Sequence, residues 1–237
     1  MSKNMYVKEL WRYPVKSMRG ERLDSAEITS NGVAGDRLLH VRDRRGVLTG
    51  RTRHALLGLP AATGEDGQIR VAGRPWNAPE IADLVRAAAG PGAELVRYAG
   101  PERFDVLNLL VATDGAIAEL GYDHRRLRPN IVIGGVPGLA ERGWPGQALR
   151  IGDVLIGMLK LRSRCIVTTI DPDTGAQDLD VLRTIRHGYE GTFALDSWAA
   201  APGTIRVGDD VELVELDPRR PLPRPGGWIV GAPYLVA

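Results

Sequence analysis

The sequence of 237 residues contains a single cysteine, Cys165. One thiol cannot form a disulfide within its own chain, so no covalent cross-link contributes to stability and the fold has to rest on a hydrophobic core. Cys165 is therefore either packed in the interior or chemically active. A lone free thiol is also typical of a reducing compartment, which predicts a cytoplasmic protein.

Long apolar runs and a strong charge of one sign are also absent. No stretch reaches the roughly 18 apolar residues that a membrane-spanning helix needs, and no apolar signal core follows the first residues. The net charge of +2 is too small to predict binding to nucleic acid or to an anionic membrane. The apolar share of 43% and the charged share of 25% are ordinary for globular proteins and argue against a disordered or fibrous chain.

Short β-strands separated by turn residues account for most of the chain. Gly-Asp pairs at 152–153 and 208–209 each stand between apolar β-type runs, which favours a barrel or sandwich over a doubly wound sheet. Helical spacing of apolar residues predicts only three helices, at 79–89, 114–120 and 178–186. We therefore expect a mainly β protein with a few helices. The predicted strands are 6–11, 23–29, 37–41, 47–49, 106–111, 130–133, 148–151, 154–161 and 165–170.

Basic residues precede the cysteine. Lys160, Arg162 and Arg164 lie within five positions of Cys165. Such cations favour the thiolate, which is the form of cysteine that attacks electrophiles and binds soft metals.

Four further segments concentrate cationic or hydrogen-bonding groups at the ends of predicted strands, at 13–17, 35–37, 49–51 and 126–130. If these segments converge, Lys16, Arg37, Arg51 and Arg128 would form a cationic pocket for a phosphorylated or otherwise anionic ligand. The alternative is that each of these side chains is solvated separately at the surface.

Together with Ser-Arg-Cys at 163–165 and Asp-Pro-Asp-Thr-Gly at 171–175, these segments resemble the MOSC family, domains related to the C-terminal part of molybdenum cofactor sulfurase. The resemblance covers roughly residues 5–215. Within the family, the chain resembles members that are similar to the amidoxime-reducing component. It implies a β-barrel-like N-terminal module at 1–90, interlocked with a MOSC β-barrel at 91–216. A Pro-rich tail at 217–237 is expected to pack back on its own domain.

The resemblance also implies a molybdenum cofactor bound between the two modules. The thiolate of Cys165 would be a ligand of the metal, with Ser163 and Arg164 close to it, and Arg51 would join the cofactor contacts. The implied contacts of the pterin and its phosphate are Lys16, Ser17, Arg37, Arg128 and Asn130.

The implied activity is that of a molybdenum-dependent oxidoreductase that reduces small N-hydroxylated or N-oxide compounds. A chain with one cysteine cannot ligate an iron–sulfur cluster, so electrons are expected from a separate flavoprotein reductase or iron–sulfur protein. The sequence departs from reductase relatives at Gly50, Met18 and Arg142, where those relatives often have Gln, Cys and an acidic residue. Arg142 would change the charge beside the mouth of the substrate site.

Other functions fit the same residues. The protein could be a sulfur carrier through Cys165, or a protein that binds the molybdenum cofactor without reductase activity. The cations could instead hold another phosphorylated cofactor such as pyridoxal phosphate, for which catalysis would need Lys16 as the Schiff-base lysine. A Cys/His hydrolase using Cys165 and His187 leaves the cationic segments unexplained. The four histidines are scattered, which argues against a zinc site.

Overall fold

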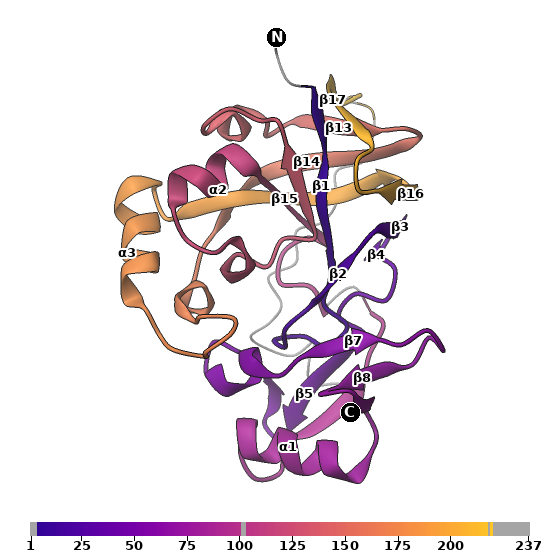
Figure 1. The fold of residues 1–237 in the computed structure, drawn as a ribbon, viewed down its shortest axis with the longest axis vertical. Helices are drawn as coiled ribbons and strands as arrows, with labels where there is room; N and C mark the ends of the chain where they lie inside the picture. Colours follow the sequence, from indigo (N-terminus) through magenta and orange to yellow (C-terminus); the bar gives the residue numbers. More distant parts are fainter. Residues whose placement is uncertain (1–3, 101–102, 218, 220–237) are drawn as a thin grey trace.

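The computed structural model describes residues 4–100, 103–217 and 219. Figure 1 shows two units one above the other, with β1, β13, β14, β15 and β17 in the larger unit and β5, β7, β8 and α1 in the smaller. The smaller unit is formed by N-terminal residues, yet the first strand of the chain belongs to the larger one.

The larger unit is a closed barrel of seven strands. Strand β1 pairs with β12 on one side and with β17 on the other, which joins the two ends of the sheet and leaves neither with an open edge. Only β11 and β12 pair in parallel within the barrel. In barrel order the strands are β1 (Met5–Arg12), β12 (Ile131–Gly134), β11 (Leu109–Thr113), β15 (Thr192–Ala201), β14 (Val154–Ser163), β13 (Gln147–Ile151) and β17 (Asp210–Glu215).

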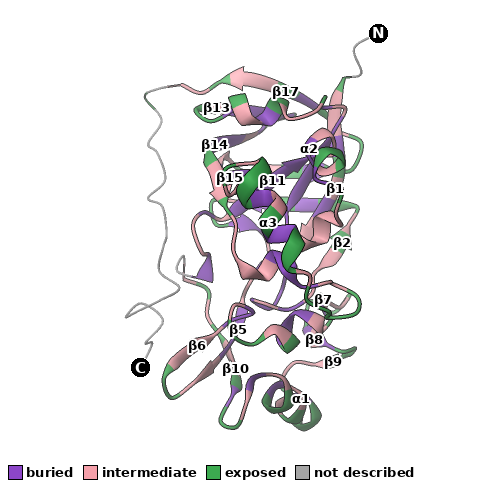
Figure 2. Cartoon of the chain, turned by 90° about the vertical axis from the view of Figure 1, so that its left-hand side faces the viewer, coloured by how far each residue is buried: buried purple, intermediate pink, exposed green. Residues whose placement is uncertain are grey.

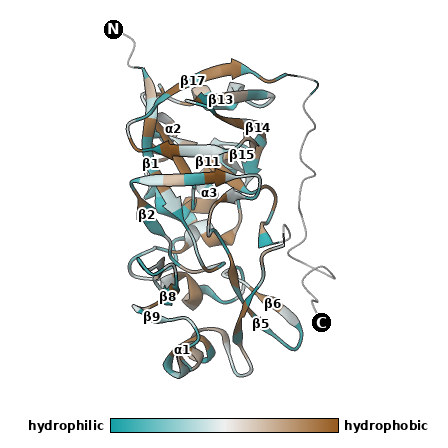
Figure 3. Cartoon of the chain, turned by 90° about the vertical axis from the view of Figure 1, so that its right-hand side faces the viewer, coloured by the Kyte–Doolittle hydropathy of each residue, from teal (hydrophilic) through white to brown (hydrophobic). Residues whose placement is uncertain are grey.

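The barrel encloses the larger hydrophobic core. Val7 and Leu10 from β1 pack in one cluster with Ile131 and Ile133 from β12 and with Ile156 from β14. Figure 3 shows hydrophobic segments in β17 at one end of the molecule and in β5 at the other, in line with a separate core in each unit.

The smaller unit contains two three-stranded sheets and one helix. One sheet has the order β10 (Glu94–Arg97), β5 (Leu39–Asp43), β6 (Gly46–Leu48), and the other has β7 (Ala61–Thr63), β8 (Ile69–Val71), β9 (Arg74–Pro75). Helix α1 (Pro79–Ala89) buries Ile81, Val85 and Ala89, which are spaced four residues apart on one face. Figure 2 shows the outward side of α1 exposed.

Two pairings interlock the N-terminal segment of the chain with the larger unit. Strand β3 (Ser25–Thr29) lies between β4 (Gly32–Val33) and β16 (Gly203–Arg206), so an N-terminal segment pairs with one near the end of the described chain. Strand β2 (Glu21–Leu23) extends the barrel sheet beside β1. A mainly β fold of two interlocked units with a few helices is confirmed.

The predicted helix ends follow from local chemistry. Thr113 Oγ1 accepts a hydrogen bond from Ala116 N at the start of α2 (Asp114–Leu120), and Gly121 ends this helix with a φ of 72°. Helix α3 (Leu179–Gly188) begins one residue later than predicted, because Asp178 caps it through its side chain. Within the described residues these two and α1 are the only α-helices.

The strand predicted at 165–170 is wrong. Residues Ile166–Thr169 form the 3-10 helix η5, and Cys165 is the extended residue that precedes it. The hydroxyls of Thr168 and Thr169 donate to the carbonyl oxygens of Cys165 and Ile166 at 2.8 and 2.7 Å, so local side-chain bonds override the β-branched pattern.

Three other strand expectations need correction. Residues 23–29 divide into β2 and β3, and the strand predicted at 106–111 begins only at Leu109. The Gly152-Asp153 turn forms the β13–β14 hairpin, whereas Gly208-Asp209 connects β16 and β17, which lie in different sheets.

The predicted tail lies outside the described residues except for Asp217 and Arg219. Within the described part, none of the helices has the length and apolar character to cross a membrane.

Candidate functional site

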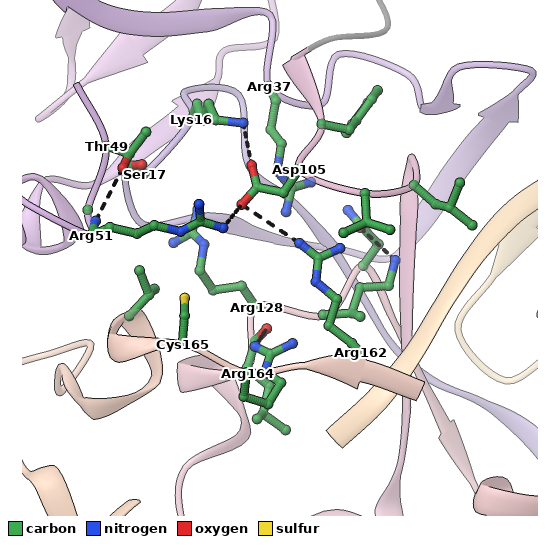
Figure 4. A pocket seen from close by; sticks show the side chains of 18 of the residues that line it. Lys16, Ser17, Arg37, Thr49, Arg51, Asp105, Arg128, Arg162, Arg164 and Cys165 are labelled. Carbon is green, nitrogen blue, oxygen red and sulfur yellow. Dashed lines mark hydrogen bonds and ion pairs between the residues drawn. The ribbon is translucent and has the colours of Figure 1, made fainter. Parts of the chain in front are cut away.

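One cavity of about 400 Å³ is lined by residues from both units (Figure 4). It brings together all nine residues that the sequence predicts for the site, although they come from five separate segments of the chain. They are Lys16, Ser17, Arg37, Arg51, Arg128, Asn130, Ser163, Arg164 and Cys165. Their individual roles as cofactor or metal contacts stay predictions.

Each of these segments follows or precedes a strand. Lys16 and Ser17 follow β1, and Lys16 N donates to Leu39 O of β5 at 2.7 Å, which ties this loop to the smaller unit. Arg51 follows β6, Arg128 precedes β12, and Cys165 follows β14. The cavity therefore lies where strand ends of the barrel meet loops of the N-terminal unit.

The backbone of three lining residues is left-handed. Ser17, Arg37 and Arg128 have φ angles of 66°, 54° and 60°, a region that residues with a Cβ rarely adopt. Backbone hydrogen bonds hold two of them there, from Arg37 N to Tyr13 O at 2.7 Å and from Arg128 N to Arg125 O at 3.1 Å. Such conformations gather at functional sites because they direct side chains that a regular strand or helix would not present.

A buried carboxylate supports this backbone from behind. Asp36 accepts hydrogen bonds from Tyr13 N at 2.7 Å and from Asn130 Nδ2 at 3.1 Å, and it pairs with the Arg37 guanidinium. Asn130 Oδ1 also accepts from Leu110 N at 3.2 Å. The backbone oxygen of Asn130 accepts a hydrogen bond from Trp11 N at 2.8 Å, so Asn130 connects β1, β11 and the start of β12 in addition to bordering the cavity.

Asp105 is the only carboxylate among the lining residues, and sequence reasoning missed it. Its Oδ1 lies 2.6 Å from Lys16 Nζ, and its Oδ2 lies 3.2 Å from Arg51 Nη2 and 3.7 Å from Arg162 Nη2. Burial alone would raise the pKa of Asp105, but the attraction of Lys16 and then of Arg162 lowers it from 3.8 to about 2. No motif marks Asp105, because it lies in an irregular segment before β11.

Six cationic side chains line the same cavity: Lys16, Arg37, Arg51, Arg128, Arg162 and Arg164. Asp105, together with Asp36 behind Arg37 and Asp196 behind Arg162, supplies three negative charges against six positive ones, so the cavity keeps a net positive charge. The sequence indicates Arg162 only as a basic neighbour of Cys165, not as a site residue. Its position near the end of strand β14 is the feature that could have indicated that it lines the cavity.

Two of these guanidinium groups lack a hydrogen-bond partner at one buried nitrogen, Arg128 Nη2 and Arg164 Nε. The Arg128 guanidinium lies 4.3 Å from the centre of the Tyr13 ring, and Arg164 Nη2 donates to Leu127 O at 2.6 Å. Burial lowers the pKa of both arginines to about 10. A bound anion would compensate this burial cost, which fits a site for phosphate.

Cys165 is partly exposed, and Figure 4 shows its sulfur pointing toward the space between Arg51 and Arg128. Among the residues that the structure describes, no group of three or more His, Cys, Asp or Glu side chains is placed to hold a metal ion. A metal at Cys165 would therefore take its other ligands from the group that carries it. The Cys165 thiol, as a metal ligand, and the cations that line the cavity, as partners of an anion, together fit a metal cofactor with an anionic end.

The three departures from the family pattern lie in different environments. Gly50 lines the cavity, whereas Met18 is fully buried in the core of the smaller unit. Arg142 is not a lining residue; its guanidinium pairs with Glu190 at 3.2 Å. The expected change of charge beside the substrate site is therefore not supported for Arg142.

Comparisons with known proteins identify related domains in both halves of the chain. The family model for the MOSC N-terminal beta barrel domain matches residues 4–89, and that for the MOSC domain matches residues 110–212. The chain is 32% identical to mitochondrial amidoxime-reducing component 1 of Homo sapiens over 60% of this chain and 44% of that protein, less than half of its length. The corresponding protein of Mus musculus is 27% identical over 88% of this chain and 82% of its own.

Among solved structures, the YUAD protein from Bacillus subtilis is similar with a TM-score of 0.49 at 12% identity, covering 91% of this chain and 98% of that one. The family rests on the two domain matches, which together account for most of the described residues and for both sides of the cavity. This chain belongs to the MOSC domain family, with a MOSC N-terminal beta barrel domain followed by a MOSC domain.

Proposed function

We propose that this protein binds the molybdenum cofactor in the cavity and reduces small N-hydroxylated or N-oxide compounds. The observation that carries the proposal is the convergence of six cations around the only thiol of the chain. Membership of the MOSC family and similarity to proteins named amidoxime-reducing components support it.

The chain's residues divide into two groups for this purpose. Arg128, Arg164, Arg37 and Lys16 offer forked or multiple N–H donors for the phosphate of the cofactor, and the hydroxyls of Ser17 and Ser163 offer further hydrogen bonds. The Cys165 thiolate would be the protein ligand of the metal, because a soft, electron-rich donor suits a redox-active centre.

The cofactor, when bound, supplies the two-electron chemistry that the side chains lack. For an amidoxime, two electrons and two protons break the N–O bond and give an amidine and water. The electrons would come from a separate redox protein, because one cysteine cannot hold an iron–sulfur cluster. Asp105 is ionised at neutral pH because its pKa is about 2, so it orients cations instead of donating the proton.

Elemental and pterin analysis tests the cofactor. Protein made in a molybdenum-replete host that synthesises the pterin is expected to contain molybdenum and pterin in equal amounts, close to one per chain. Cys165→Ala should lose the metal while keeping part of the pterin, and Cys165→Ser serves as a matched variant that keeps size and polarity. A folded wild-type protein that never contains molybdenum or pterin would refute the proposal.

Turnover tests the reaction. Molybdenum-containing protein supplied with an artificial reductant is expected to convert benzamidoxime to benzamidine. Persulfide labelling at Cys165 without any turnover would instead indicate a sulfur carrier.

A further inference from the structure

Arg51 and Arg162 approach one carboxylate from opposite sides of the cavity (Figure 4). Both guanidinium groups face the same oxygen, Asp105 Oδ2, at 3.2 and 3.7 Å, while Lys16 takes the other oxygen at 2.6 Å. Three cations thus share Asp105, and Asp196 supplies a second negative charge behind Arg162. The three cations therefore keep one positive charge more than these two carboxylates neutralise.

Arg162 is held in place from the other side. Its Nη1 lies 2.6 Å from Oδ1 of Asp196, a carboxylate whose side chain is only 1% exposed. Arg162 is on β14 and Asp196 on the adjacent β15, so the ion pair is built into two neighbouring barrel strands. One edge of the guanidinium is fixed in the barrel, and the other faces the cavity through the longer contact with Asp105.

Exposure distinguishes Arg51 from the cations assigned to the cofactor phosphate. The side chain of Arg51 is 36% exposed, against 17% for Arg162, 16% for Arg37 and 5% for Lys16. Arg128 and Arg164 have buried nitrogen atoms without partners. Among the four cations compared by exposure, Arg51 therefore lies nearest to solvent, and Arg162 approaches the same Asp105 oxygen beside it. The unpartnered nitrogens of Arg128 and Arg164 instead suit a resident anion.

We propose that Arg162 and Arg51 form a carboxylate-binding fork, and that the substrates of this protein are N-hydroxylated compounds that also carry a carboxylate. A planar guanidinium with one edge preset is suited to bind a carboxylate through two parallel N–H···O bonds. Asp196 is a positioning residue in this arrangement, because it acts only through Arg162. The inference rests on the proposed function, since it names the substrate class of the same site.

A pair of substrates that differ by a single carboxylate group provides the kinetic test. For molybdenum-containing protein, kcat/KM for para-carboxybenzamidoxime is expected to exceed that for benzamidoxime by about tenfold or more, the scale of a charge-assisted contact. Arg51→Gln should reduce this ratio to near one. Arg150→Gln is the matched control, because Arg150 is exposed on β13 and does not line the cavity; it should keep the wild-type ratio.

Arg162 needs a second design, because its removal alone would leave Asp196 buried without a partner. The double variant Arg162→Leu/Asp196→Leu removes both charges together and should also abolish the preference for the carboxylate. Arg162→Lys keeps the ion pair but not the planar fork, and it should retain only part of the preference.

Binding provides a readout that does not depend on turnover. Calorimetry of the purified protein, with and without molybdenum, is expected to show benzoate binding at least tenfold more tightly than benzamide, and the preference should fall in Arg51→Gln and in the double variant. If neither substrate is reduced, the proposed function fails while benzoate binding still decides the inference. Equal binding of benzoate and benzamide, or benzoate binding that both variants leave unchanged, would overturn it.

Discussion

Replacing Asp105 by Asn removes the only carboxylate of the cavity while nearly keeping its shape. Lys16, Arg51 and Arg162 lower the pKa of Asp105 from 3.8 to about 2, so the folded state favours the ionised form. This shift corresponds to about 2 kcal/mol of folding stability at neutral pH. We therefore expect Asp105→Asn to lower the free energy of unfolding by at least about 2 kcal/mol at pH 7, because Lys16 is also left buried without this counter-ion.

The pH dependence gives the sign of the effect. A depressed carboxyl pKa stabilises the fold above the unfolded value of 3.8, and this contribution is lost as the pH falls toward about 2. Urea unfolding of protein purified without molybdenum, followed by circular dichroism at several pH values, should show the difference between wild type and variant shrinking to about half by pH 3. Asp153→Asn in the exposed β13–β14 turn is the control and should change little. A variant as stable as wild type at pH 7, or a difference that stays constant down to pH 3, would refute the assignment of Asp105 as the shared counter-ion.

Three further outcomes follow from the same site. Asn130→Ala should lower the free energy of unfolding in urea by about 2 kcal/mol, because it removes partners of the buried Asp36 and of a β11 backbone amide; an unchanged midpoint would contradict this. Arg128→Gly should be about 1 kcal/mol more stable than Arg128→Ala in the same assay, since only glycine adopts a φ of 60° without cost, and the reverse order would count against backbone strain. Inorganic phosphate should raise the Tm of protein purified without molybdenum in a saturable way, because Arg128 and Arg164 are buried cations with unpartnered nitrogens. Chloride at equal ionic strength is the comparison for phosphate, and an equal rise with chloride would indicate general screening.

The local chemistry of the sequence was sufficient to predict most of the helices and strands. Helix α1 begins at Pro79 and ends before Gly90, and α2 begins after Thr113 and ends before Gly121, as the capping residues predict. The failure at 165–170 shows the limit of pattern reasoning, since two threonine hydroxyls bind nearby carbonyls and turn a β-branched run into the 3-10 helix η5.

The candidate site was predictable only in its motifs. Each cationic segment is short and contiguous, so its residues can be read directly from the sequence, and a resemblance to one family groups them. Asp105 and Asp196 carry no motif, because each acts on a side chain far away in the chain: Asp105 on Lys16 and Asp196 on Arg162. Such partners can be identified only when the three-dimensional arrangement of the strands is known.

The composition, local patterns and motifs of the sequence were sufficient for a mainly β chain held by its core without disulfides, for the positions of its helix caps, and for nine of the residues that line the cavity. Tertiary structure alone decided the closure of the barrel through β1 and the interlocking through β3 and β16, because these pairings join distant segments that no local pattern links. It also decided how the charge of the site is divided. Burial and distance assign Asp105 to three cations and fix Arg162 through Asp196, and neither quantity exists before the chain is folded.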